Sequence, residues 1–266
     1  MPFVDSNGGR IHYRLDAPEN ASPDAPCVVL SNSLGSNLSM WDFQMPALLQ
    51  HFRVLRYDTR GHGQSSATPG PYTNDQLTLD IVRLLDTLQI KRAHFCGLSM
   101  GGLAGMRLGV AAPERIDKLV LCSTGAKIGS DELWKTRIDT VLEKGMGPVA
   151  GTVHERWFTA SFAVRQPSAI ESIRQAVLQC SPEGYVACCA AIWNGDERGS
   201  ISRIRARTLV ISGHSDPATP PSDGHFLAAN IPGAEYVELE GSHLSNVECA
   251  DEFNEVLLGF LRGSRA

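Results

Sequence analysis

The sequence has no uninterrupted hydrophobic run long enough to cross a bilayer, although 42% of its 266 residues are hydrophobic. Residues 1–9 also lack the basic segment and the apolar segment of a secretory signal. The first absence argues against a membrane-spanning protein, and the second argues against a secretory signal. With no positive targeting signal in view, we expect a cytoplasmic protein.

Positive charge is also in short supply, because 24 Lys and Arg residues face 29 Asp and Glu residues, for a formal net charge of −5. Such a surface would repel a phosphate backbone, and no basic stripe offsets it. We therefore expect a small-molecule substrate and no nucleic-acid partner. An anionic substrate would need cations supplied locally by its site. The sequence leaves the oligomeric state open.

Cysteine is present, but not in pairs that suggest disulfides or metal ligands. The chain has seven cysteines, an odd number, and only Cys188 and Cys189 are neighbours. Cys27, Cys96 and Cys122 lie within or beside apolar runs, which favours reduced, buried thiols. No pair has the spacing of metal ligands. We expect neither a metal ion nor a cofactor.

Short apolar runs alternate with helical patterns over most of the chain. The runs occupy residues 26–30, 52–57, 93–96, 118–122, 208–211 and 236–239. Helical spacing of apolar residues marks 74–88, 102–110 and the region around 253–260. Nearly continuous apolar strands with helices between them predict an α/β fold whose mostly parallel central sheet is covered on both faces.

The alternation breaks between about residues 128 and 205. This stretch has helical patterns and three tryptophans but no convincing strand. It separates two strand-like segments, as an inserted helical lid would. The predicted division is a core of residues 1–127 and 206–266 and a lid, or cap, of residues 128–205.

The most specific motif is Gly97-Leu98-Ser99-Met100-Gly101, directly after one predicted strand and directly before a helix. Gly-x-Ser-x-Gly in that context is a nucleophile elbow, in which a tight turn exposes the serine hydroxyl. Small residues on either side allow neighbouring backbone to approach closely. Ser99 is therefore the predicted nucleophile, in preference to an ordinary Gly/Ser turn.

Serine needs a general base, and position along the chain selects one among eight histidines. His243 follows the last predicted strand and Asp216 follows the strand before it. Ser99, Asp216 and His243 then occur in the chain order of α/β hydrolases. His214 is the nearest competitor for the base, but it lies in the loop of the predicted acid.

An oxyanion hole needs two backbone donors. One is predicted at the N–H of Met100, directly after the nucleophile. The other is predicted at the N–H of Leu34, in the loop after residues 26–30. The glycine-rich segment 58–65 is interpreted as a tight structural loop rather than as part of the catalytic machinery.

Together these motifs resemble the α/β-hydrolase superfamily from about residue 11 to residue 261. Finer features resemble one branch of it, the 3-oxoadipate enol-lactonases of aromatic breakdown. These features are residues 32–35 with Trp41-Asp42, residues 96–102, residues 216–220, and Trp134, Arg137 and residues 156–158 in the lid. Many relatives carry His-Gly where this chain has Asn32-Ser33. The resemblance implies hydrolysis of a small, carboxylate-bearing enol-lactone without cofactor or metal.

One observation about the lid is independent of the family. On a helix, Leu133, Trp134, Ile138, Val141 and Leu142 share one apolar arc. Arg137 falls inside that arc, where a cation is unfavourable unless it is paired.

Two interpretations of Arg137 stay open. Its head reaches water or a lid carboxylate such as Glu155, or it binds a substrate carboxylate. Trp134 and Trp157 are predicted to line the substrate site beside it.

Other functions also stay open at this point. The same motifs fit a general carboxylesterase or a carbon–carbon bond hydrolase, and the sequence excludes a redox activity on this fold poorly. A non-catalytic ligand-binding member is disfavoured because all three triad residues are present.

Overall fold

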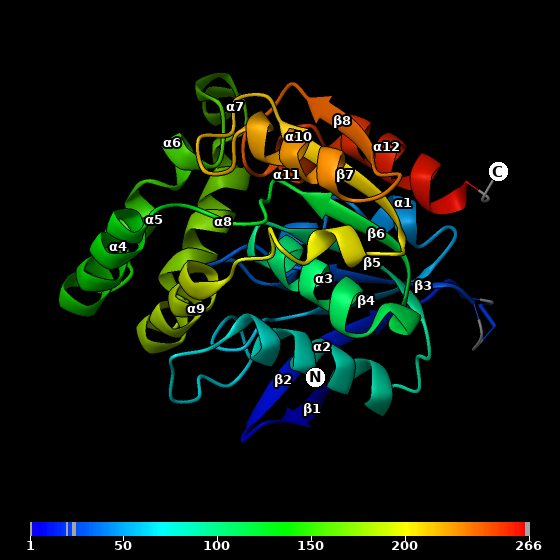
Figure 1. The fold of residues 1–266 in the computed structure, drawn as a ribbon. Helices are drawn as coiled ribbons and strands as arrows, with labels where there is room; N and C mark the ends of the chain where they lie inside the picture. The colour runs from blue at the N-terminus through cyan, green and yellow to red at the C-terminus, as the bar shows by residue number, and fades with distance from the viewer. Residues whose placement is uncertain (1, 20, 23–24, 264–266) are drawn as a thin grey trace.

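An eight-stranded sheet forms the centre of the computed structural model, which describes residues 2–19, 21–22 and 25–263 (Figure 1). Its strands, in sheet order, are β1 (Phe3–Ser6), β2 (Gly9–Asp16), β4 (Arg53–Tyr57), β3 (Cys27–Ser31), β5 (Ala93–Leu98), β6 (Ile116–Cys122), β7 (Arg207–Gly213) and β8 (Glu235–Leu239). All pairs from β4 to β8 are parallel. The six predicted strands and the mostly parallel sheet are confirmed.

The first two strands form an antiparallel hairpin that the sequence interpretation missed. Ser6 pairs with Gly9, which leaves a two-residue turn of Asn7 and Gly8. Both turn residues have positive φ, 44° and 79°, as the favoured two-residue hairpin turns require. Asn-Gly between strand-like segments was the sequence signal that could have revealed this hairpin.

Helices cover both faces of the parallel strands because successive side chains of each strand point to opposite faces. On β5, the ring of Phe95 packs beside Gly105 of α3 (Met100–Ala111), while the ring of His94 packs edge-on against Phe52, 5.5 Å away. Figure 1 shows α2 (Asn74–Thr87) and α3 in front of the sheet. The remaining core helices are α1 (Met45–Leu48), α10 (Pro221–Asn230), α11 (Ser245–Glu248) and α12 (Ala250–Arg262).

Six α-helices lie between β6 and β7, where the described chain has no strand. They are α4 (Asp131–Lys144), α5 (Gly147–Gly151), α6 (Val153–Arg156), α7 (Ala160–Arg165), α8 (Pro167–Leu178) and α9 (Pro182–Asn194). Figure 1 shows them gathered beside the sheet, at the left of the view. We call them the inserted helices.

One inserted helix, α9, is tied directly to the core. The Tyr72 N–H donates to the Ala187 carbonyl over 3.1 Å. Gly184 lies against Gly61 so closely that a Cβ on either would collide with the backbone of the other. Helix α9 therefore packs directly against the core and anchors one side of the inserted helices to it.

The glycine-rich loop after β4 has a structural role, as the sequence interpretation holds. Asp58 accepts hydrogen bonds from the N–H groups of Leu38 and Gln64. Arg60 is fully buried, and its guanidinium donates to both carboxylate oxygens of Asp80, over 2.9 and 2.6 Å. The buried cation is paired, which satisfies its charge without involving a substrate.

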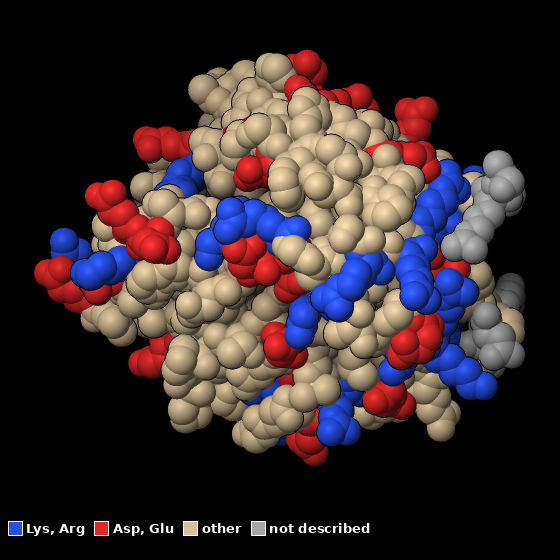
Figure 2. All heavy atoms as spheres, in the orientation of Figure 1, with Lys and Arg blue, Asp and Glu red and all other residues tan. Residues whose placement is uncertain are grey.

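The surface combines both signs of charge. Figure 2 shows basic side chains grouped toward the right of the view, with acidic side chains among them. Ion pairs at the surface include Arg207 with Glu235 and Arg115 with Asp86. Within the described residues, no helix combines the length and the apolar character that a membrane crossing needs.

Candidate active site

Ser99 occupies a sharp turn between β5 and α3. Its φ of 56° and ψ of −113° lie outside the regions that a non-glycine residue normally adopts. The turn is held because Gly97 and Gly101 bring three backbone segments together: a Cβ on Gly97 would collide with Gly101, and one on Gly101 would collide with Ser31. Thr124 donates its hydroxyl to the Ser99 carbonyl over 2.8 Å. The sequence motif has therefore folded into a strained elbow with a fixed backbone.

Asp216 and His243 meet although 27 residues separate them along the chain. His243 Nδ1 lies 2.8 Å from Asp216 Oδ2, and both side chains are buried. The Asp216 carboxylate also accepts from the N–H groups of Ala218 and Thr219 and from the Thr219 hydroxyl. Burial by itself raises the pKa of Asp216, but the His243 charge and these hydrogen bonds bring it below its usual value. An ionised carboxylate thus orients the imidazole through Nδ1.

Ser99 and His243 line one small cavity of about 70 Å³. The predicted residues Leu34, Trp134, Arg137 and Trp157 line the same cavity. The structure therefore brings the predicted nucleophile, base and lid residues to one place, with Asp216 directly behind the base. Thr219 was not singled out from the sequence; its position three residues after the acid was the available signal.

The two predicted oxyanion donors lie on either side of the elbow. Within the described chain, neither the Leu34 N–H nor the Met100 N–H has a hydrogen-bond partner. The loop of Leu34 is held by the next residue, because the Gly35 N–H donates to His62 Nε2 over 2.8 Å. Burial lowers the pKa of His62, which keeps this nitrogen available as an acceptor. His62 is a contributor that the sequence interpretation did not anticipate.

Asn32 lies in the loop after β3 and is fully buried. Its amide donates to the Tyr57 carbonyl over 2.7 Å and accepts from the Trp41 indole N–H over 3.0 Å. The backbone carbonyl of Asn32 accepts a hydrogen bond from the Gly101 N–H over 3.1 Å. Asn32 therefore links the loop of Leu34 to the nucleophile elbow and to Trp41.

Arg137 lies on α4 with its guanidinium over the Trp134 ring, 5.5 Å from the ring centroid. Its hydrogen bond to the Tyr185 hydroxyl is long, at 3.4 Å. Among the described residues it has no carboxylate partner, and Glu155 instead pairs with His154. The pairing with Glu155 is therefore wrong, while a guanidinium that reaches water and one that binds a substrate carboxylate both stay predictions.

The predicted apolar arc of α4 is only partly correct. Trp134 and Val141 are buried, and Leu133 and Ile138 are partly buried. Leu142 is 66% exposed, because the inserted helices leave that part of α4 uncovered. The buried apolar face of α4 is therefore narrower than the sequence pattern predicts.

Comparison with known proteins decides the family. The α/β-hydrolase-fold family model matches residues 26–145. A 3-oxoadipate enol-lactonase from Acinetobacter baylyi is 44% identical over 234 residues, which are 88% of each chain. The crystal structure of an enol-lactonase from Burkholderia xenovorans is 48% identical, with a TM-score of 0.96 over 98% of this chain and 100% of that one. A putative carbamate hydrolase from Stutzerimonas stutzeri is 30% identical over 94% of this chain and 96% of its own length.

The chain belongs to the α/β-hydrolase family. It is an enzyme of the esterase type, and the resemblance to enol-lactonases drawn from its motifs is confirmed.

In this hydrolase, the histidine loop is tied to the inserted helices. The Leu244 N–H donates to the Trp157 carbonyl over 3.1 Å. Glu248 accepts from the Ser242 N–H over 3.0 Å and from the N–H and hydroxyl of Thr159. The position of Trp157 is thus coupled to the loop that carries the predicted base.

Arg156 is a second cation at the site, to which the sequence interpretation gave no role. It lines the Ser99 cavity together with Arg137. Burial, and then the nearby charge of Arg137, lower the pKa of Arg156. Its neighbour Trp157 was assigned to the site, so adjacency was the signal that could have revealed it.

His214 does not line the cavity that contains Ser99, so its position does not suit a general base. Its ring is exposed, and Nδ1 lies 2.6 Å from Glu238 Oε1. The hydrogen bond and charge of nearby carboxylates raise its pKa. Across the described residues, no group of three or more His, Cys, Asp or Glu side chains could hold a metal ion.

Proposed function

We propose that this enzyme hydrolyses 3-oxoadipate enol-lactone to 3-oxoadipate through a Ser99, His243 and Asp216 triad. One observation carries the proposal. The elbow serine, the histidine paired with a carboxylate, and an arginine without a carboxylate partner line or adjoin one cavity. Similarity to proteins named 3-oxoadipate enol-lactonase supports the same substrate.

In the first half-reaction, His243 Nε2 takes the Ser99 proton as Ser99 Oγ attacks the lactone carbonyl carbon. The N–H groups of Leu34 and Met100 stabilise the oxyanion, and they need no reorganisation because no described residue accepts a hydrogen bond from either of them. The ring C–O bond then breaks. The ring-opened enolate takes the proton that His243 carries and becomes the ketone, so His243 is neutral again and the acyl chain, which contains that ketone, stays on Ser99.

In the second half-reaction, His243 removes a proton from water, and the resulting nucleophile attacks the acyl carbon. Collapse of the second oxyanion returns the proton to Ser99 and releases 3-oxoadipate. Asp216 stays ionised throughout, because its pKa lies below the usual value, and it stabilises the imidazolium that forms twice in each cycle.

The inserted helices select the substrate in this proposal. Residues 128–205 act as the lid over the core of residues 1–127 and 206–266. Arg137 pairs with the acetate arm of the lactone, and Trp134 and Trp157 enclose the ring. A guanidinium suits a carboxylate because it donates two parallel hydrogen bonds.

The enol of the opened ring is a good leaving group. The lid therefore contributes more to the choice of substrate than to breaking the ester bond. In this proposal the reaction is a step in the catabolism of aromatic compounds.

The test is a panel of substrates followed by ultraviolet absorbance: the enol-lactone, p-nitrophenyl acetate and a small carbamate. We expect kcat/KM on the enol-lactone to exceed that on the neutral ester by roughly 100-fold or more, because only the former engages Arg137. Equal rates on both esters would identify a general carboxylesterase. Preference for the carbamate would favour the activity named for the relative at 30% identity. No turnover of any of them would favour a ligand-binding protein.

A further inference from the structure

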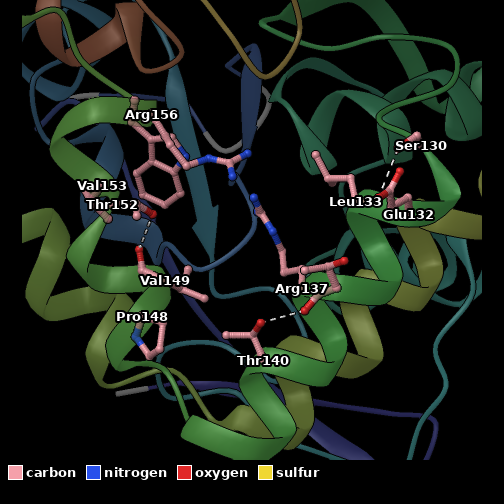
Figure 3. Close-up of a pocket in the computed structure, with 12 residues that line it drawn as sticks. Ser130, Glu132, Leu133, Arg137, Thr140, Pro148, Val149, Thr152, Val153 and Arg156 are labelled. Carbon is pink, nitrogen blue, oxygen red and sulfur yellow. Dashed lines mark hydrogen bonds between the residues drawn. The ribbon is translucent and has the colours of Figure 1, made fainter.

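A second, larger cavity of about 440 Å³ lies between α4 and the segment of α5 and α6. It shares Leu133, Arg137, Arg156 and Trp157 with the cavity that contains Ser99. These shared residues form a neck between the outer cavity and the nucleophile. Figure 3 shows the guanidinium groups of Arg137 and Arg156 pointing toward one another across this space.

Two like charges in this position repel each other, and burial strengthens the repulsion. Both side chains are only partly exposed, and Arg137 contributes electrostatically to Arg156. Within the part of the chain that the structure describes, neither forms an ion pair with a carboxylate. The Arg156 guanidinium has no hydrogen-bond partner among the described residues, and the Arg137 guanidinium has only the long hydrogen bond to the Tyr185 hydroxyl.

Carboxylates near the neck do not neutralise this pair. Glu132 lines the outer cavity but forms no ion pair with either arginine. Glu155 pairs with His154, and Asp216 is engaged by His243. The charge of Asp216 acts on Arg156 in the direction that raises its pKa, but no carboxylate of the described residues forms an ion pair with either guanidinium, which is the geometry of an anion site.

We propose that Arg156 and Arg137 together form a carboxylate-binding site at the neck, with the substrate's carboxylate held between the two guanidinium groups. The identity of the carboxylate as the acetate arm of an enol-lactone rests on the proposed function. The site itself does not, because any small carboxylate of suitable size satisfies the same geometry. Arg156 is then a specificity-determining residue equal in kind to Arg137.

A consequence for stability follows from the repulsion. Removing one guanidinium relieves it in the free enzyme but removes half of the carboxylate site. Arg156→Met should therefore raise the thermal midpoint of the free enzyme by roughly 1–4 °C while it weakens the anionic substrate. A structural arginine would give the opposite change in stability.

The first experiment compares Arg156→Met, Arg137→Met and the double variant with wild type on the enol-lactone and on p-nitrophenyl acetate. Arg165→Met is the matched control, because Arg165 is an exposed arginine at the end of α7. We expect Arg156→Met to lower kcat/KM on the enol-lactone about 10- to 100-fold, mainly through KM, and the neutral ester to lose far less. The double variant should lose less than the product of the single losses, since both groups hold one carboxylate.

Equal losses on both substrates, or a lower thermal midpoint for Arg156→Met, would overturn the proposal and make Arg156 a support for lid packing. Wild-type behaviour of Arg156→Met on the enol-lactone would overturn it while leaving the proposed function intact.

The second experiment needs no enol-lactone activity. Glutarate is used to inhibit hydrolysis of p-nitrophenyl acetate, with the neutral diamide glutaramide as the control inhibitor. We expect the inhibition constant of glutarate to rise about 10-fold or more in both single variants, and that of glutaramide to change little. If wild type proved inactive on enol-lactones but kept this dependence on both arginines, the proposed function would fall and the carboxylate site would stand. Glutarate inhibition that is unchanged in Arg156→Met would remove Arg156 from the site.

Discussion

The charged groups of the Asp216–His243 pair and those of the neck, Arg137 and Arg156, differ in how many hydrogen bonds the protein gives them. The Asp216 carboxylate accepts hydrogen bonds from Ala218, from the N–H and hydroxyl of Thr219, and from His243. The Arg137 guanidinium has one long hydrogen bond, and Arg156 has none to a described residue. The charge proposed to act in the chemistry is thus satisfied by hydrogen bonds within the protein, and the charges proposed to bind a ligand have no carboxylate partner among the described residues.

The difference has a physical basis. Transition-state stabilisation is strongest when the dipoles and charges are already in place and cost nothing to reorganise. Selective binding of an anion has the opposite requirement. A cation that is already paired with a carboxylate of the protein gains little binding free energy from an anionic substrate, so the cation should be unpaired in the free enzyme.

The largest effect is expected at the nucleophile. Ser99→Ala should lower kcat roughly 10⁴- to 10⁶-fold, because no other hydroxyl stands on the elbow. The fold should stay intact, since the change removes only the hydroxyl and the elbow is held by backbone contacts. Steady-state rates and circular dichroism measure both. Retention of more than about a tenth of the activity would remove Ser99 from the mechanism.

A smaller, substrate-dependent effect is expected at the neck. Arg137→Met should cost about 2–4 kcal/mol in kcat/KM on the anionic lactone, roughly 30- to 1,000-fold, and far less on a neutral ester of similar size. The same kinetic panel as above provides the measurement. A uniform loss on both substrates would contradict a role in charge recognition.

The smallest effect concerns stability, and it arises in the core. Burial lowers the pKa of His94 on β5 to about 4, although the Asp117 carboxylate opposes the shift. Between about pH 6.5 and pH 4, His94 is therefore protonated in the unfolded chain but neutral in the folded chain. Because the folded pKa is the lower one, stability is lost as the pH falls through this window.

Urea unfolding at pH 7.5 and pH 5.0 tests this sign. On going to pH 5.0, wild type should lose about 2 kcal/mol at His94, and a His94→Phe variant should not show that part of the loss. Phenylalanine suits the site because the imidazole already packs edge-on against Phe52. The exposed His51→Gln variant is the control and should follow wild type. An equal acid loss in wild type and His94→Phe would assign the effect to other groups.

Much of the fold was predictable because its signals are local. Each parallel strand is a short apolar run, since a strand covered on both faces needs apolar residues on both. The elbow was predictable because only glycine allows the backbone contacts at residues 97 and 101. The β1–β2 hairpin was missed although Asn7-Gly8 marks it, because its strands alternate in polarity and give only weak apolar runs.

What the sequence by itself determined is the order of the parallel strands and the candidate nucleophile, acid and base, since these follow from periodicity and from short motifs. The tertiary structure decided how those groups are satisfied. Whether Arg137 pairs with Glu155, whether His62 supports the loop of Leu34, and whether Arg156 faces Arg137 all depend on contacts between distant segments. A sequence states the charge of a side chain, but its neighbours in space determine its electrostatic environment, and only the packed chain supplies those neighbours.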